Sequence, residues 1–295
     1  MTELLQLVFQ GVALGSVYAL IALGFAIVFR SSHVINFAQG SMLLVAAYGV
    51  SWLVTDHGVP FGVAVVLAAL AVSMGGWLFH ATVLQRLPSA SPLVLVMVTI
   101  GLSVALEGTI AVAFGPERRV LGDPWGSDAV HVGGLVLNEV KIWAIVTAGL
   151  ALAAFFLFDR RSRYGLAMRA TATDPEAASA VGVAVGRVQG ISWAMAGAVA
   201  CLGGVFLAGF PNAPTLSLGD AALRAFPAII LGGLGSPAGA VVGGLTIGLV
   251  EVLSSGYAPS ALGEGFAGVA PYIVMIVVLL IRPYGLFGSR PVERA

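Results

Sequence analysis

Two carboxylates stand in surroundings where charge is scarce. Glu107 follows Ser103 within one long apolar stretch, and Glu251 precedes Ser254 and Ser255 within another. An ionised side chain is costly to place inside a membrane, so such residues are by default candidates for a proton site or a substrate path. Structural interpretations remain open beside this one. Glu251 lies near enough to the end of its stretch to be solvated or hydrogen-bonded to Ser254 or Ser255, and Glu107 has polar neighbours that could face another helix or a watery cavity.

A polar segment, residues 159–188, is the second concentration of chemical groups, and it contains five arginines. Asp174-Pro-Glu176 predicts a helix start, because Asp favours the N-cap, Pro the first helical position and Glu the first turn. Gly182 is typical of a helix end. Residues 164–170 predict another short helix before it. The segment is therefore expected to hold two short helices, and the alternative is a solvated loop with ordinary positive-inside arginines.

Several motifs of known chemistry are missing. The sequence contains no Gly-x-x-x-x-Gly-Lys-Ser/Thr loop for nucleotide phosphates, no His-Glu-x-x-His and no Gly-x-Ser-x-Gly. We therefore expect no catalytic residues, no metal and no cofactor, and any ATP must be hydrolysed by another chain. Cys201, which has no second cysteine to pair with, is expected to serve packing. The histidines are expected at membrane interfaces: His33, His57, His80 and His131.

Composition identifies the kind of chain that must position these groups. The 295 residues are 59% hydrophobic and 9% charged, with a mean hydropathy of +1.00, whereas soluble domains carry about 25% charged residues. The protein is therefore an integral membrane protein, and its zero net charge gives no reason to expect nucleic acid. Its 39 glycines suit helices that pack closely through small residues, as at Gly11/Gly15 and Gly239/Gly243.

The apolar pattern predicts an all-α fold, a polytopic transmembrane helix bundle that forms one domain over residues 1–295. A full span needs roughly 20 apolar residues. We predict eight full spans plus one short broken helix, Ala221–Leu231, which ends at Gly232, Gly233, Gly235 and Pro237. The eight spans are expected at about 4–29, 41–55, 61–84, 92–114, 142–158, 189–210, 237–255 and 267–282.

Lysine and arginine residues set the expected orientation. If the N-terminus is outside and the short segment crosses, ten of the 14 basic residues lie inside and four lie outside. We therefore predict an N-out, C-in topology with segment 159–188 inside. The four outer ones are Arg118, Arg119, Lys141 and Arg224.

Four stretches then stand out as motifs: GVALGSVYALIALG (11–24), VINFAQG (34–40), GLAMRATATDPEAASAVGV (165–183) and FPAIILGGLGSPAGA (226–240). In this order they resemble the branched-chain amino-acid permease family of ABC importers, the LivH type. The resemblance implies a multi-pass protein of the bacterial inner membrane, with the lipid bilayer around it. It also implies two cytoplasmic ATPase subunits, a second homologous permease subunit and a periplasmic solute-binding protein as partners.

In such permeases, segment 159–188 is a coupling loop that docks into the ATPase and transmits its movement. The resemblance implies that Arg169 and Glu176 fix the register of docking, with Asp174 as the cap, and that Ala177, Ala178 and Gly182 allow close approach. Asn36 and Gln39, which hydrogen-bond the unwound backbone or line the path, join Glu107 as candidates for the translocation path. Many relatives have His in place of Gln39 and an acidic residue in place of Ser41, which leaves the substrate and the coupling open.

Three functional hypotheses remain beside a permease for branched-chain or similar amino acids. An ABC permease for urea or short amides would share every feature above. A proton-coupled secondary transporter would use Glu107 or Glu251, and an intramembrane enzyme is disfavoured because its motifs are missing. The outer loop 115–140 is a further candidate, as a docking surface for the binding protein or as a plain solvated loop, through Glu117, Arg118, Arg119, Asp123 and Asp128.

Overall fold

The computed structural model describes residues 2–87, 90–115, 117–125, 128–132, 135–209, 212–259 and 265–288. Most of these residues are helical, which confirms the predicted helix bundle. In chain order the elements are α1 (Thr2–Ser32), α2 (Gln39–Ser51), the π-helix η1 (Trp52–Asp56), α3 (Phe61–Thr82), the 3-10 helix η2 (Leu84–Arg86), α4 (Pro92–Phe114), β1 (Ala129–Val132), β2 (Leu135–Asn138), α5 (Glu139–Arg161), α6 (Arg163–Thr173), α7 (Pro175–Ala180), α8 (Val185–Ala208), α9 (Leu218–Leu223), α10 (Phe226–Gly232), α11 (Pro237–Tyr257) and α12 (Phe266–Ile281).

Six helices in the described part of the chain are long and apolar enough to cross a membrane: α1, α3, α4, α5, α8 and α11. The other two expected spans are shorter. The segment predicted at 41–55 is the 13-residue α2 continued by five π-helical residues, and the one at 267–282 is the 16-residue α12. The structure thus supports a polytopic bundle, and six of the eight expected spans meet the length required.

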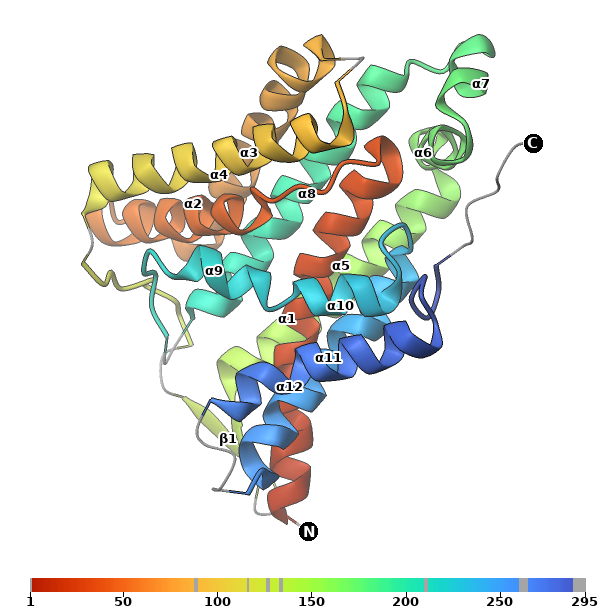
Figure 1. Ribbon diagram of the computed structural model, residues 1–295. Coiled ribbons are helices and arrows are strands. Elements are labelled where there is room, and N and C mark those ends of the chain that lie inside the picture. Colours follow the sequence, from red (N-terminus) through yellow and green to blue (C-terminus); the bar gives the residue numbers. More distant parts are fainter. Residues whose placement is uncertain are drawn as a thin grey trace.

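Helix α1 is the central helix of the bundle, and Figure 1 shows it running through the middle of the molecule. Of its most apolar 18 residues, 83% are buried, mainly against α11, α8 and α5. Small residues make this packing possible. A Cβ added at Gly15 would lie 2.8 Å from the Cα of Leu245, and one at Gly11 would lie 3.0 Å from the Cα of Leu249. The backbones of α1 and α11 therefore touch, as the small-residue spacing predicts.

In contrast to α1, helices α3 and α4 are largely exposed. Only 22% of the apolar window of α3 and 11% of that of α4 are buried, although both windows have a mean hydropathy of 2.1. Exposed apolar side chains on a membrane protein face lipid or another apolar chain. On their inner side α3 packs against α2 and α8, which also pack on each other.

The short segment expected at 221–231 is divided in two. Helix α9 ends at Leu223 and α10 begins at Phe226, so the break falls inside the predicted element as well as after it. Gly233 follows α10 with a φ of +101°, a conformation that favours glycine. The chain after α12 then returns to α10, where the amides of Leu286 and Phe287 donate to the carbonyls of Leu231 and Gly232 at 2.8 and 3.0 Å.

A small antiparallel hairpin corrects the all-α expectation. Strands β1 and β2 pair in the outer loop, with Val130 opposite Leu137. The side chain of Gln6 attaches this hairpin to the start of α1, because its amide nitrogen donates to the Val136 carbonyl at 2.6 Å and its oxygen accepts from the Val136 amide at 3.1 Å. Each strand has only four residues, and an alternation of apolar and polar residues over so short a length does not distinguish a strand from a loop.

Candidate functional site

The polar segment forms the two short helices that the sequence predicts, α6 and α7. The Asp174 carboxylate caps α7 by accepting from the amides of Glu176 and Ala177, each at 3.0 Å, and Pro175 occupies the first turn. Gly182 follows α7 with a φ of +90°. Residues next to α7 in the sequence therefore define both of its ends. Figure 1 shows α7 projecting beside α6 at one end of the molecule.

The expected docking residues of this segment lie in different environments. Glu176, Ala177 and Gly182 are exposed. Ala178 is only 4% exposed, and its carbonyl accepts the amide of Val183 at 3.0 Å. The surface of α7 that another protein could reach is thus carried by Glu176 and Ala177, with Gly182 at its end, and Ala178 supports it from within.

A buried carboxylate attaches α6 to the bundle. Asp159, at the end of α5, is 8% exposed and lies 3.3 Å from Arg30 of α1 and 3.3 Å from Arg169 of α6. Arg169 also donates to the Asp159 carbonyl. Gly165 packs so closely on the backbone of Asp159 that any Cβ there would overlap it. Arg169 is therefore part of a joint between the loop and the bundle, which the sequence did not indicate.

The turn between α1 and α2 is built around Asn36 and Gln39, both of which are fully buried. The side-chain oxygen Oδ1 of Asn36 accepts from the Ala38 backbone amide at 3.1 Å, and its Nδ2 donates to Oε1 of Gln39 at 3.2 Å. Gln39 donates in turn to the carbonyl of Ala196 on α8 at 3.2 Å, and its side chain rests on Gly24. Asn36 thus hydrogen-bonds the unwound backbone, one of the two roles expected, whereas Gln39 bonds the helical backbone of α8.

Glu107 belongs to a polar cluster between α2 and α4. The hydroxyls of Ser41 and Ser103 donate to its Oε1 at 2.7 and 3.1 Å, and the two hydroxyl oxygens lie 2.6 Å apart. Ser41 is buried and Glu107 is partly exposed. Gly219 of α9 lies beside the carboxylate, since a Cβ there would be 3.4 Å from Oε1. The carboxylate is therefore held by donors yet remains open on one side.

Glu251 has partners other than the serines expected for it. Its carboxylate accepts a hydrogen bond from the Tyr18 hydroxyl at 2.8 Å and lies 3.8 Å from Arg224. The expectation of Ser254 or Ser255 as partners was wrong, because α11 turns Glu251 toward α1. The Arg224 side chain is 60% exposed, so water screens this ion pair.

Arg119 fastens the outer loop to the end of η1. Its guanidinium lies 2.6 Å from the Asp56 carboxylate, 3.4 Å from the Thr55 hydroxyl and 5.1 Å from the Phe114 ring centroid, and its amide donates to the Pro214 carbonyl at 3.2 Å. Hydrogen bonds from Thr55 and Arg119 hold the pKa of Asp56 below its ordinary value. Arg119 thus joins loop 115–140 to the end of η1 and to the segment before α9.

The other outer-loop residues named from the sequence differ in their exposure. Glu117, Arg118 and Asp128 are exposed, whereas Asp123 is partly buried. Of the four histidines, His80 lies at 3% exposure and the other three are exposed. Within the described ranges no group of three His, Cys, Asp or Glu side chains is arranged to hold a metal ion.

These features define the class of the protein, a multi-pass membrane protein whose buried polar contacts fasten a projecting two-helix loop. A solved structure agrees with the fold: the chain titled PsaBC from Streptococcus pneumoniae in complex with Fab matches with a TM-score of 0.51 and 12% identity, covering 96% of this chain and 93% of that one. At this identity the match concerns the fold alone.

Sequence comparison identifies the family. Residues 7–281 match the family model described as branched-chain amino acid transport system, permease component. The chain is 33% identical over 311 residues to the high-affinity branched-chain amino acid transport system permease protein LivH of Salmonella typhimurium, and 32% identical over 306 residues to that of Escherichia coli K12. Each match covers 98% of this chain and 97% of the relative. The chain therefore belongs to the branched-chain amino-acid permease family of ABC transport systems.

Proposed function

We propose that this chain is the membrane-spanning subunit of an ATP-driven importer for branched-chain or similar amino acids. It works in the inner membrane of a bacterium, with its N-terminus outside and its coupling loop inside. Two cytoplasmic ATPases drive it, a second homologous permease completes the path, and a periplasmic binding protein delivers the cargo. Family membership supports the class of protein, and the named relatives transport branched-chain amino acids.

The observation that carries the proposal is the coupling loop. A lever must be rigid, present a surface to its partner and be attached to the part that moves. Helix α7 is capped by Asp174, and it exposes Glu176 and Ala177. The joint at Asp159 fastens α6 to α5 and to α1, the central helix. Force on α7 therefore has a short packed route to the centre of the bundle.

For the path itself we propose Glu107 ahead of the two amides. Asn36 and Gln39 are fully buried and use their side chains on each other and on backbone, whereas Glu107 is only partly buried. Ser41 lies 2.7 Å from Glu107. Helix α4 thus places an acidic group beside Ser41. A carboxylate at this place suits the ammonium group of an amino acid better than it suits urea.

The first test is purification of the tagged chain in mild detergent, with its bound partners identified and ATP hydrolysis measured. Recovery of two ATPases and a second permease supports the proposal, and uptake of labelled leucine against labelled urea then decides the cargo. A chain that purifies alone and without ATPase activity would instead favour a proton-coupled transporter.

The second test reverses one charge on the lever. Glu176→Lys should leave the protein folded, because the side chain is exposed, and should weaken docking of the ATPase or abolish coupled uptake. Glu3→Lys is the matched control, since Glu3 is an exposed carboxylate in the first turn of α1, far from α7. Normal uptake by the Glu176 variant would refute the role given to α7.

A further inference from the structure

The turn between α9 and α10 combines a buried backbone with an exposed charge. The two helices have six and seven residues, about 9–11 Å each, so neither crosses a membrane alone. Figure 1 shows them running across the molecule beside the middle of α1. A broken helix at membrane depth is stable only where protein buries it or water reaches it. In this turn Ala225 is fully buried, whereas Arg224 is exposed.

The contacts of Arg224 indicate its depth in the bundle. Its guanidinium lies 3.8 Å from the Glu251 carboxylate, which accepts a hydrogen bond from the Tyr18 hydroxyl at 2.8 Å. Tyr18 is 2% exposed and stands at the middle of the 31-residue α1. Arg224 therefore carries its positive charge near the level of the middle of the central helix, with 60% of its side chain exposed.

An exposed cation at this level does not suit a surface that faces lipid. Charged side chains within membrane segments are costly, so they face the interior of the protein or water, where they mark substrate paths. Glu251 balances Arg224 only in part, because solvent reaches the guanidinium and screens the pair. The exposed side of Arg224 therefore belongs to a water-filled path or to a contact with another subunit.

A charge of opposite sign lies at the other end of α9, and it favours the path. A Cβ added at Gly219 would lie 3.4 Å from Oε1 of Glu107. From Gly219 to Arg224 the chain advances about 7–8 Å at the rise of a helix. The ammonium and carboxylate of an α-amino acid share one carbon, and with a charge-assisted hydrogen bond of about 2.8 Å at each end they span a gap of this order. The two charges thus suit a zwitterion.

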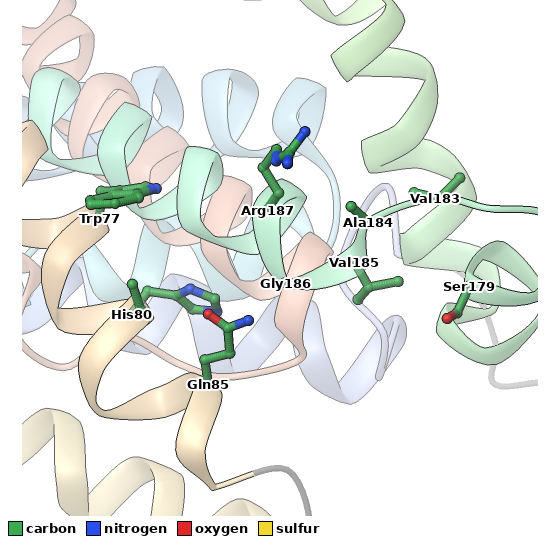
Figure 2. Close-up of a pocket in the computed structure, with 10 residues that line it drawn as sticks. Trp77, His80, Gln85, Ser179, Val183, Ala184, Val185, Gly186 and Arg187 are labelled. Atoms are coloured by element: carbon green, nitrogen blue, oxygen red, sulfur yellow. The ribbon is translucent and has the colours of Figure 1, made fainter.

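A pocket of about 520 Å³ elsewhere in the bundle lacks this pairing. It opens between the end of α3 and the start of α8, and Figure 2 shows Trp77, His80 and Gln85 across from the chain around Arg187. Among the described residues that line it, Arg187 is a cation and none is acidic. Its walls therefore do not offer a zwitterion both of the charges that it needs.

We propose that Arg224 is a binding residue of the translocation path and takes the carboxylate of the amino-acid cargo. Glu251 and Tyr18 hold the guanidinium in position, and the cargo carboxylate approaches it from the exposed side. Leu223, next to it and 42% exposed, offers an apolar contact to the cargo side chain. Glu107 faces the ammonium group. This inference rests on the proposed function, because it requires an amino acid as the cargo.

Uptake of labelled leucine into proteoliposomes that hold the complete transporter, with ATP inside and saturating binding protein outside, tests this role. Arg224→Gln should lower maximal uptake at least about tenfold, because it removes a charge-assisted contact with the carboxylate. Arg224→Lys keeps the positive charge and should lose less. Arg86→Gln is the matched control, an exposed arginine of η2, and should stay within about twofold of the wild type.

A charge swap separates binding of the cargo from a merely structural ion pair. The double variant Arg224→Glu with Glu251→Arg keeps two opposite charges in contact but exchanges their places. Its melting midpoint should recover relative to those of the two single variants, whereas its leucine uptake should remain as low as that of Arg224→Gln. Recovery of uptake together with stability would overturn the proposal, because the pair would then act only through its own attraction.

The remaining outcomes distinguish this inference from the proposed function. A wild-type transporter that imports urea and not leucine would refute the cargo and this inference together. Wild-type leucine uptake that is matched by Arg224→Gln would overturn this inference alone. Loss of the second permease from the purified Arg224→Gln complex would also overturn it, because Arg224 would then belong to the contact between subunits.

Discussion

The ion-pair joint at Asp159 allows a quantitative prediction. Asp159→Ala leaves Arg30 and Arg169 without their shared carboxylate. At 3.3 Å each pair attracts by about 4–5 kcal/mol for an effective dielectric near 20, and most of this is offset by desolvation of the charges. The side chains of Arg30 and Arg169 are 18% and 35% exposed, so water also screens part of the attraction. A net loss of about 2–3 kcal/mol in unfolding free energy is expected.

A melting curve in detergent, followed with a thiol-reactive dye, measures this loss. Cys201 is the only cysteine and is fully buried, so the dye reacts when the bundle opens. Each kcal/mol shifts the midpoint by about 2–4 °C for a chain of this order of size, so Asp159→Ala should melt roughly 5–10 °C lower. Asp159→Asn keeps the shape of the side chain, so its melting midpoint should lie between those of the wild type and of Asp159→Ala.

The control is Glu176→Ala, which removes an exposed carboxylate of the same loop and should leave the midpoint unchanged. In a double-mutant cycle, Arg30→Ala and Asp159→Ala should couple by at least about 1 kcal/mol, because their side chains are in contact. An unchanged midpoint for Asp159→Ala, or strictly additive effects in the cycle, would refute the joint as a stabilising contact and leave the route from α7 to α1 without support.

Three further predictions concern other parts of the bundle. Gly244→Leu should prevent folding in a protease-protection assay, because a Cβ there would overlap the backbone of Ala19, and a variant that inserts normally would contradict the packing of α11 on α1. Arg119→Ala should lower the melting midpoint only slightly in the same assay, because water screens its contacts. Since the pKa of Asp56 is lowered in the fold, the contribution of the pair should be present above the ordinary Asp range and fade as the pH falls through the lowered pKa; a loss that grows at alkaline pH would contradict the pairing. Glu107→Gln keeps an acceptor for the two serine hydroxyls and should melt like the wild type while leucine uptake falls at least about tenfold; full uptake would remove this residue from the path.

Local pattern was sufficient to predict the two short helices of segment 159–188. Asp174, Pro175 and Gly182 each act within a few residues of their own position, so the cap, the first turn and the end of α7 could be predicted from neighbouring residues. The hairpin β1–β2 was missed because strands of four residues carry too little alternation. The sequence does carry a signal for the break between α9 and α10, which was missed: Pro227 stands in the first turn of α10, where it has no N–H to donate to the preceding turn.

Polar partners distant in sequence could not be predicted. Tyr18 and Glu251 are 233 residues apart and Arg30 and Asp159 are 129 apart, and no short-range rule joins them. Similarly, His80 belongs to an apolar helix whose sequence gives no sign that its face turns toward α8. A place at the membrane interface was expected for it, and the packing instead buries it, with its Nδ1 unpaired.

The sequence by itself determined that this is a membrane protein, that it belongs to one permease family, and that a capped two-helix loop interrupts its apolar helices. Those properties depend on composition, on ordered motifs and on contacts within one or two turns, all of which are written along the chain. The tertiary structure alone decided which carboxylates are shared, which arginine joins the loop to the bundle, and where α3 and α8 leave a pocket. These depend on how helices rotate and cross, and that is fixed by close packing of small residues over the whole bundle.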